Sequence, residues 1–308
     1  MVIVQNILKY DKQHDTAITI GTFDGVHVGH RMILERLISN TSDTSLKSTL
    51  LTFFPHPRMV LQKDSDIKLL NTIDEKTKIL EDLGLDQLII HPFTKEFSRL
   101  SSTEFVRDLL VNKLNARKIV IGYDHRFGRN RNANINDLIT YGRTFGFEVD
   151  EIPAQEIDEI SVSSTKIRRA LEDGNISTAN KYLGYDYMLT GVVQKGKGVG
   201  RQLNFPTANL FIEEKYKLIP KNGVYVVNAM LSGKIVSGMM NIGYNPTVNG
   251  TMKSIEIHFF DFDEDLYGQI IQVNILKRIR DEHKFDSVED LKKQLEKDRE
   301  TSIAILSR

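Results

Sequence analysis

The stretch GTFDGVHVGH, residues 21–30, decides the fold of the first part of this chain. It follows a short apolar run, 17–20, and leads into a segment whose apolar residues recur at helical spacing. It is therefore the turn between a first strand and a first helix. Its glycines let the backbone approach a ligand closely. Exposed N–H groups and the helix dipole favour an anion there, most often a phosphate, and His27 and His30 would add donors to it.

Two familiar phosphate-binding motifs do not fit this stretch. No Gly-Lys-Ser/Thr follows at the spacing of a Walker A loop, and the glycines do not form a G-x-G-x-x-G fingerprint. Spacing alone leaves a second interpretation open, a glycine-rich turn from strand to helix with two surface histidines.

Outward from this turn, the residues up to about 152 alternate between strand and helix patterns. Capping boxes at Thr72 and Ser101 open two of the helices. The runs that predict strands are 17–20, 48–54, 86–91, 117–121 and 147–152. Such alternation predicts a parallel sheet with helices on both faces, whose ligands bind beyond the carboxyl ends of the strands. We therefore expect the turn at 21–30 and the loops at 55–58 and 122–134 to meet at that edge.

Two more polar segments belong to this first part. The loop Gly-Tyr-Asp-His-Arg-Phe-Gly-Arg-Asn-Arg, residues 122–131, is dense in hydrogen-bond donors, although a solvated loop would have the same composition. The segment Ser-Ser-Thr-Lys-Ile-Arg, residues 163–168, predicts a helix over 165–173 that ends at Gly174. Cations beside its exposed N–H groups would make a second phosphate site; an ordinary capped helix is the alternative.

After about residue 185 the pattern changes to short β-branched and aromatic runs separated by Gly, Pro and Asn. These runs are 188–194, 224–231, 235–242, 254–262 and 269–276. Strands at this spacing predict a closed antiparallel barrel. A final helix is predicted from about Ser287 to Lys297. We place the domain boundary between residues 184 and 185.

The segment 196–209 carries the main candidate functional residues of the second part. A glycine loop with two cations could cover phosphates. A Thr207 hydroxyl and an Asn209 carbonyl, two residues apart, project to the same side of an extended chain and suit Mg²⁺. A flexible hairpin is the alternative. In the strand at 254–259, Glu256 and His258 share the polar face, where an ordinary solvent-facing residue is the alternative for Glu256.

Composition limits the function further. The 308 residues are enough for about two domains. Lys+Arg and Asp+Glu are equal at 41 each, so no global charge points to nucleic acid or an anionic membrane. The chain has no cysteine, which excludes disulfides and thiolate metal sites and fits a reducing cytosol. It has no apolar run of the roughly 18 residues of a membrane span and no start typical of secretion, so we expect a cytoplasmic protein.

With these motifs in place, H-x-G-H after a first strand resembles the nucleotidylyltransferase superfamily. The longer string G-T-F-D-G-V-H-x-G-H is similar to the bifunctional riboflavin kinase/FMN adenylyltransferases, or prokaryotic FAD synthetases. The family motifs S-S-T-x-I-R, G-R-x-L-G-F-P-T-A-N, N-I-G-x-x-P-T and R-x-E-x-x-F resemble later segments in the expected order. Asn204 stands where the family usually has Gly, which predicts a positive φ there. Glycines are also common in the family near Asn130 and Ala133.

The resemblance implies two domains with two reactions. A Rossmann-like nucleotidylyltransferase domain, residues 1–184, would join FMN to the ATP α-phosphorus and release pyrophosphate. A riboflavin kinase barrel, residues 185–308, would transfer the ATP γ-phosphoryl group to the riboflavin 5′-hydroxyl. Riboflavin, FMN and ATP are then the substrates, and Mg²⁺ is the cofactor.

The resemblance also implies site residues. In the adenylyltransferase, His27 and His30 stabilise charge on the triphosphate, and the ATP site comprises Gly21, Phe23, Asp24, His27, His30, Ser163, Ser164, Thr165 and Arg168. A flavin or nucleotide loop comprises Asp124, Phe127 and Arg131. In the kinase, Glu256 is the general base and Thr207 and Asn209 hold Mg²⁺. The kinase phosphate site comprises Gly198, Gly200, Arg201, Thr207 and Asn209, and the flavin contacts are Arg280 and Glu282.

Two other functions stay open from the sequence. The first is an adenylyltransferase whose barrel only binds flavin and regulates; Thr207, Asn209 and Glu256 argue against it, and a kinase assay decides it. The second is a non-enzymatic flavin sensor or RNA-binding barrel. Equal numbers of acidic and basic residues, without a clustered aromatic and basic stripe, argue against that one.

Overall fold

The computed structural model describes residues 1–62, 66–153, 162–196, 200, 203–247 and 250–307. The chain divides into two compact units, residues 1–163 and 164–308.

The first unit is built on a six-stranded sheet with the strand order β1-β4-β3-β2-β5-β6. Every pair of neighbouring strands is parallel. The strands are β1 (Val2–Gln5), β2 (Thr16–Ile20), β3 (Lys47–Phe53), β4 (Gln87–His91), β5 (Ala116–Gly122) and β6 (Glu148–Ile152). The predicted parallel sheet is confirmed. Strand β1 was not predicted, because it has four residues at the edge of the sheet and three of them are exposed.

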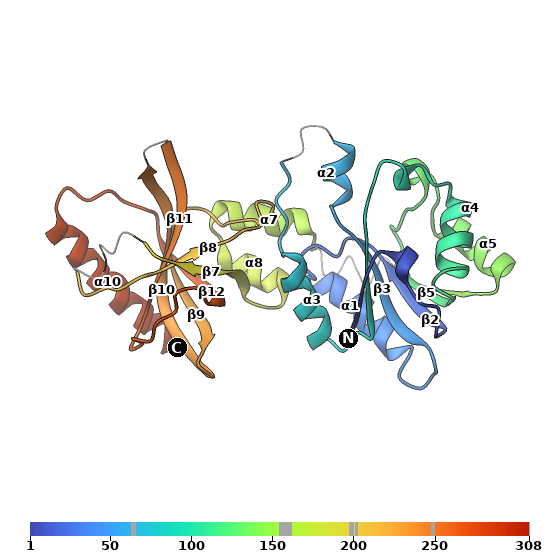
Figure 1. Ribbon diagram of the computed structural model, residues 1–308, viewed down its shortest axis with the longest axis horizontal. Coiled ribbons are helices and arrows are strands. Elements are labelled where there is room, and N and C mark those ends of the chain that lie inside the picture. Colours follow the sequence, from blue (N-terminus) through green and yellow to red (C-terminus); the bar gives the residue numbers. More distant parts are fainter. Residues whose placement is uncertain (63–65, 154–161, 197–199, 201–202, 248–249, 308) are drawn as a thin grey trace. The chain divides into compact units, whose positions relative to one another are not determined.

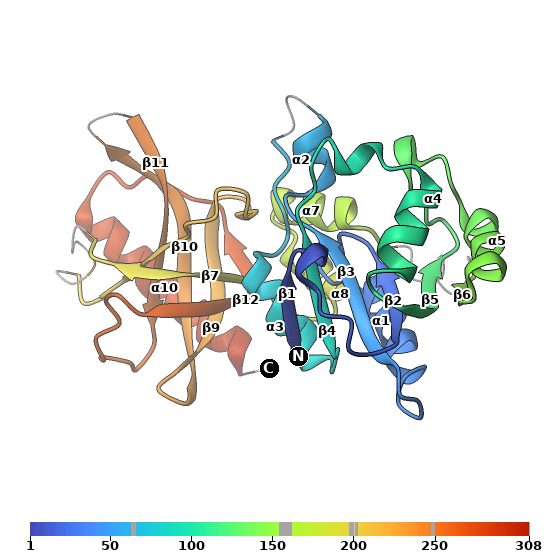
Figure 2. The same ribbon diagram turned by 45° about the vertical axis from the view of Figure 1, so that its right-hand side comes forward.

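Helices cover both faces of this sheet, as predicted. They are α1 (Val28–Ser39), α2 (Pro57–Leu61), α3 (Ile73–Asp82), α4 (Ser102–Glu104) with its π-helical continuation η3 (Phe105–Val111), and α5 (Ile135–Phe145). Figures 1 and 2 show α1 and α3 on one face and α4 and α5 on the other. Short 3-10 turns lie at η1 (Ile7–Lys9), η2 (Phe97–Arg99) and η4 (Arg129–Arg131). The capping boxes at Thr72 and Ser101 are both formed.

The carboxyl ends of the strands bring the predicted loops together. Strands β3, β2 and β5 are consecutive neighbours in the sheet and run in the same direction. The loops that follow them, beginning at residues 21, 54 and 123, therefore leave from one edge, as expected.

The second unit is a closed six-stranded barrel with the order β10-β11-β8-β7-β12-β9, preceded by two helices and followed by one (Figure 1). The helices are α7 (Ser164–Asp173), α8 (Ile176–Leu183) and α10 (Val288–Leu306). The strands are β7 (Tyr187–Gln194), β8 (Ala208–Phe211), β9 (Gly223–Leu231), β10 (Lys234–Thr247), β11 (Gly250–Phe259) and β12 (Ile270–Arg280). All paired strands are antiparallel, so the predicted barrel is confirmed.

Several elements of the second unit differ from the sequence prediction. Helix α8 and strand β8 were missed because they have eight and four residues, too few for a periodic signal. Strand β10 ends at Thr247, five residues beyond the predicted run 235–242. Helix α10 runs to Leu306, nine residues beyond the expected end, because Asp298 and Ser302 are buried on its inner face.

Helices α7 and α8 pack with the barrel. The carbonyl of Leu171 accepts from the Lys221 N–H at 3.0 Å, and Asn180 Nδ2 donates to the Ile275 carbonyl at 2.9 Å. This packing explains why the compact unit begins at residue 164. The division between an adenylyltransferase part and a kinase part at 184/185 stays a prediction.

Candidate functional site

The turn at 21–27 has an unusual backbone. Phe23, Gly25 and Val26 have φ values of 45°, 88° and 35°, and a positive φ is unfavourable for Phe and for β-branched Val. Asp24, which is 3% exposed, accepts a hydrogen bond from the Leu70 N–H at 2.9 Å. A Cβ on Gly21 would lie 3.0 Å from the Phe23 ring. Gly21, Phe23 and Asp24 thus determine the conformation of the turn. Their contacts with ATP stay a prediction.

The two histidines form a stacked pair at the start of α1. His27 is the N-cap, and its Nδ1 accepts a hydrogen bond from the His30 N–H at 3.3 Å. The ring centroids are 3.6 Å apart with 14° between the planes. Because Nδ1 is an acceptor, a neutral His27 carries its proton on Nε2, which is then a donor. The Nδ1 atom of His30 is buried and has no hydrogen-bond partner in the described part of the chain.

Burial determines the charge of this pair. It lowers the pKa of His27 to about 4, against a smaller opposing effect of Asp24. Burial also lowers the pKa of His30 well below its ordinary value, and the neighbouring His27 and Lys76 lower it further. Both imidazoles are therefore neutral at pH 7. They can donate hydrogen bonds to a phosphate, but in the unliganded protein they bring no positive charge to it.

The lowered pKa of His27 makes the stability of the protein depend on pH. An unfolded histidine has a pKa of about 6.5, so between pH 6.5 and 4 the unfolded chain binds a proton that folded His27 does not. The contribution of His27 is fully present above pH 6.5 and is lost as the pH falls toward 4, by up to about 3 kcal/mol. We expect NMR of the imidazole ring to show neutral His27 at pH 5.5. A titration midpoint near 6.5 would contradict the burial argument.

The loop after β5 is organised by Phe127. This ring is 7% exposed and lies in the core, 6.0 Å from the Phe105 ring, while its backbone forms a bridge with Ala133. Asp124 and Arg131 are exposed, at and just beyond the carboxyl edge of the sheet. Asn130 has a φ of 57°, a left-handed backbone conformation that Gly and Asn adopt more readily than other residues. Of the three residues predicted to contact flavin or nucleotide, Phe127 therefore shapes the loop, while Asp124 and Arg131 are exposed.

The second predicted phosphate segment starts α7. The helix begins at Ser164, one residue before the predicted start at Thr165, and ends at Asp173 as predicted. Arg168 lies on its second turn, and Ser163 directly precedes the helix. All four are at least partly exposed. Since the compact units divide between Ser163 and Ser164, the use of both helix N-termini by one triphosphate stays a prediction.

The barrel brings the predicted kinase residues together. Glu256 on β11 lies opposite Asn209 on β8, and Asn241 on β10 is its neighbour on the other side. Thr207 Oγ1 donates to Glu256 Oε2 at 3.5 Å. Thr207, Asn209 and Glu256 therefore share one site. The site lies on the outer face of the barrel, because Ile255 and Ile257, which flank Glu256 along the strand, point into the barrel core.

Two glycines, Gly196 and Gly200, lie close to residues of this site or of the segment that leads into it. A Cβ on Gly196 would overlap the side-chain amide of Asn209, and a Cβ on Gly200 would overlap the Phe205 carbonyl. The Gly200 carbonyl in turn accepts from the Phe205 N–H at 2.8 Å. Gly198 and Arg201 lie outside the described residues. Asn204 has a φ of 63°, as the sequence comparison predicted for a position that usually has Gly.

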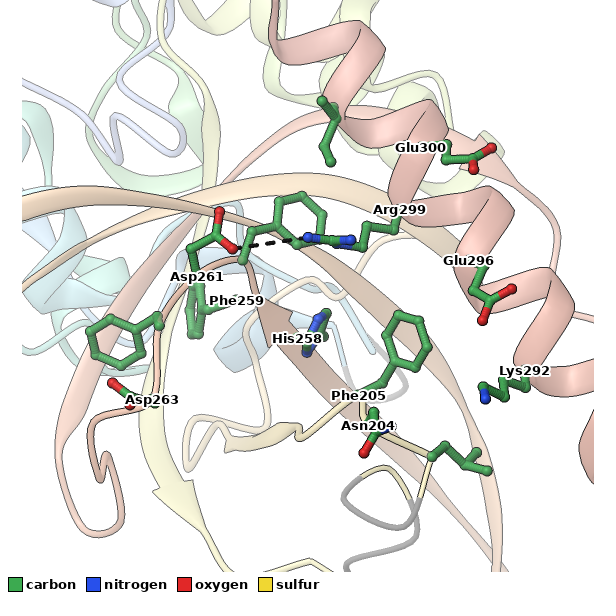
Figure 3. A pocket seen from close by; sticks show the side chains of 14 residues that line it. Asn204, Phe205, His258, Phe259, Asp261, Asp263, Lys292, Glu296, Arg299 and Glu300 are labelled. Carbon is green, nitrogen blue, oxygen red and sulfur yellow. Dashed lines mark ion pairs between the residues drawn. The ribbon is translucent and has the colours of Figure 1, made fainter.

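A cavity of about 830 Å³ lies between the barrel and α10, with Leu203, Asn204 and Phe205 among the residues that line it (Figure 3). Phe205 and His258 face into it from one side, and Arg299 lies across from them on α10. The guanidinium of Arg299 lies 3.9 Å from Asp261 and over the Phe260 ring. His258 Nδ1 donates to the Pro206 carbonyl at 2.9 Å, so the cavity wall is fixed to the segment that carries Thr207. Burial lowers the pKa of His258, which favours the neutral ring.

The two predicted flavin residues have structural partners. Arg280 forms an ion pair with Asp298 of α10 at 2.6 Å, and Asp298 is 1% exposed. Glu282 accepts from Asn222 Nδ2 at 3.2 Å and from the Tyr244 N–H at 3.3 Å. Arg280 thus anchors the final helix, and Glu282 lies beside the N-I-G-x-x-P-T segment. Their contact with flavin stays a prediction.

Two residues in these sites were given no role from the sequence. Asn241 lies opposite Glu256 on the neighbouring strand β10, and the barrel register is needed to place it there. Lys76 on α3 is 4% exposed and donates from Nζ to the Thr22 carbonyl at 2.7 Å. Its signal was a lysine one residue after the capping-box glutamate, which by itself resembles a surface position.

The residues present fit a magnesium ion. Among the described residues, no group of three His, Cys, Asp or Glu side chains could hold a metal. Thr207, Asn209 and Glu256 instead offer hydroxyl, amide and carboxylate oxygens, which are the ligand types that Mg²⁺ accepts together with water and phosphate.

No helix among the described residues is long and apolar enough to cross a membrane.

A histidine turn on a parallel sheet and an oxygen-rich cluster on a separate barrel define a two-part, nucleotide-dependent transferase. The family models for FAD synthetase and riboflavin kinase match residues 9–166 and 183–306. The chain belongs to the bifunctional riboflavin kinase/FMN adenylyltransferase family.

Individual relatives cover nearly the whole chain. The bifunctional riboflavin kinase/FMN adenylyltransferase of Haemophilus influenzae is 37% identical over 94% of this chain and 94% of its own length. That of Escherichia coli K12 is 35% identical over 94% and 92%. A crystal structure of a macrolide-efflux protein from Streptococcus pneumoniae is 31% identical, covers 98% of this chain and 99% of its own, and superimposes with a TM-score of 0.89.

Proposed function

We propose that this chain makes FAD from riboflavin in two steps that each consume ATP. The barrel phosphorylates riboflavin to FMN, and the parallel-sheet domain joins FMN to the adenylyl group of a second ATP. The observation that carries the proposal is the meeting of Thr207, Asn209 and Glu256 on three segments of the barrel, in a chain whose family has both activities.

In the kinase step the carboxylate of Glu256 accepts the proton of the riboflavin 5′-hydroxyl as its oxygen attacks the γ-phosphorus. Phosphoryl transfer depends on positioning and charge neutralisation more than on covalent chemistry. Thr207 and Asn209 would hold Mg²⁺, which neutralises charge on the phosphates when bound. The hydrogen bond from Thr207 to Glu256 keeps the carboxylate beside the metal ligands.

The cavity beside Phe205 is our candidate for the nucleotide base of ATP. Its volume lies in the range of small-molecule sites, and Phe205, His258 and Phe260 supply aromatic surface. Gly196 lies against the side-chain amide of Asn209 and Gly200 lies against Phe205, so the backbone N–H groups of these two glycines could contact the phosphates.

In the adenylyltransferase step the phosphate of FMN attacks the α-phosphorus of ATP and pyrophosphate leaves. The attacking oxygen is already anionic, so no protein base is required. His27 donates from Nε2 and His30 lies stacked against it, so the pair stabilises the charge that moves onto the leaving pyrophosphate. Ser164, Thr165 and Arg168 would hold the phosphates from the start of α7, and Asp124 and Arg131 would contact the flavin or nucleotide.

We also propose the functional boundary at 184/185. The riboflavin kinase model begins at residue 183, which supports it, although α7 and α8 pack with the barrel. A cytoplasmic location fits this function, because both steps use ATP and the chain has no cysteine to form disulfides.

The test is product analysis. The protein incubated with riboflavin, ATP and Mg²⁺ should give FMN and then FAD, identified by chromatography. Supplied with FMN in place of riboflavin, it should give FAD and pyrophosphate directly. EDTA should abolish riboflavin phosphorylation. Formation of FAD from FMN without any phosphorylation of riboflavin would mean that the barrel only binds flavin, and the absence of both products would overturn the proposal.

A further inference from the structure

The histidine turn lies against a buried cation that no motif of the sequence identified. Lys76 is on the inner face of α3 and is 4% exposed. Its Nζ donates to the Thr22 carbonyl at 2.7 Å, the residue before the first strained position of the turn. Burial lowers the pKa of Lys76, and Asp24, which is 3% exposed, opposes this effect and favours the ammonium. Burial and His27 lower the pKa of His30, and Lys76 is close enough to lower it further.

Stability alone does not explain a lysine here. Burying an ammonium is costly, and replacing a buried ion pair by apolar side chains of similar volume is often neutral or stabilising. Thr52, which is fully buried, already donates to the same Thr22 carbonyl from Oγ1 at 3.2 Å. The carbonyl would therefore keep a hydrogen bond without Lys76. What the lysine adds is a positive charge in a buried place beside the two neutral histidines.

A charge at this position suits the reaction. A triphosphate at the start of α1 would meet two imidazoles that donate hydrogen bonds but carry no charge. A fixed cation under the turn raises the electrostatic potential at that anion, and its effect is larger in a buried, low-dielectric place than in water. The same ammonium holds the Thr22 carbonyl and so fixes the strained backbone that orients His27.

We propose that Lys76 is a positioning residue of the adenylyl-transfer site, which acts through the Thr22 carbonyl and through its charge on the anion bound by His27 and His30. This inference rests on the proposed function of the parallel-sheet domain. It assigns Lys76 no contact with the substrate.

The chain offers a matched pair of variants. Lys76→Met keeps the length of the side chain and removes its charge, and Thr52→Val keeps the β-branched shape and removes the other hydrogen bond to Thr22. We expect Lys76→Met to lower kcat for FMN adenylylation by about 10²-fold, the effect of losing one preorganised electrostatic group, with KM for ATP and FMN changed only a few-fold. Lys76→Arg should restore most of the rate. Thr52→Val should lower it less than tenfold.

Riboflavin phosphorylation by the same full-length variants reports on folding of the rest of the chain and should stay at the wild-type level. Lys76→Met with kcat within a few-fold of wild type would overturn the inference. Equal losses in Lys76→Met and Thr52→Val, without recovery in Lys76→Arg, would mean that Lys76 only supports the backbone and would overturn it as well. A wild-type protein that makes no FAD from FMN would instead refute the proposed function itself.

Discussion

Replacing Glu256 by Gln should stop the protein at riboflavin. The change keeps the shape of the side chain and its ability to accept from Thr207 Oγ1, but it removes the basic oxygen. The 5′-hydroxyl is a poor nucleophile while protonated, and loss of a general base commonly lowers the rate by about 10²–10⁴-fold. The expected loss is in kcat for FMN formation, measured by chromatography of the flavins, with little change in riboflavin binding.

The second activity of the chain is the control for this variant. Glu256→Gln supplied with FMN should make FAD at the wild-type rate, because the adenylyl-transfer residues belong to other elements. If the variant phosphorylates riboflavin within a few-fold of wild type, the base assignment is wrong and the carboxylate only positions Thr207 and the metal.

The converse variant should separate the activities in the other direction. Replacing both His27 and His30 by Ala removes two donors from the proposed triphosphate site. Loss of one such donor typically costs on the order of 10²–10³ in rate, so FMN adenylylation should collapse while riboflavin phosphorylation stays near normal. Single-turnover formation of FAD from FMN would measure the loss.

Truncation of His27 also removes the N-cap of α1, which commonly costs about 1 kcal/mol of stability. His27→Asn combined with His30→Ala is the matched control, because Asn keeps an acceptor for the residue-30 N–H but lacks the imidazole donor. We expect this control to be as inactive as the double alanine variant and more stable. Recovery of FAD formation in the control, or a parallel fall of both activities, would show that the histidines only support the fold.

Much of the architecture could be predicted from the sequence because its signals are local. Alternation of apolar strand-like runs with capped helices predicts a parallel sheet, and the change to short β-branched runs predicts a barrel. The stretch at 21–30 and the Thr207–Asn209 pair were recognisable for the same reason, since each motif lies within a few consecutive residues. The positive φ of Asn204 could be predicted because this residue stands where the family motif usually has Gly.

The rest required neighbours in space. Whether Glu256 lies beside Thr207 depends on the register between β11 and β8, and β8 is only four residues long. The motif around Arg280 predicts a flavin contact. In the fold, however, Arg280 forms an ion pair with the buried carboxylate of Asp298, which lies on α10, 18 residues later in the chain. The charge of His27 could not be inferred from its neighbours in sequence, because burial by the folded chain lowers its pKa.

The sequence by itself determined the class of fold, the two sets of motifs and the family, because these depend on residue type and spacing along the chain. Only the tertiary structure decided which side chains meet and in what state they are charged. Lys76 illustrates the difference: in the sequence it is an ordinary lysine on a capped helix. Packing of α3 beneath the turn removes it from water and turns its Nζ toward the Thr22 carbonyl, 54 residues earlier in the chain. Burial and long-range contact are properties of the folded chain, and they change both the electrostatic effect and the role of a residue whose identity alone indicated neither.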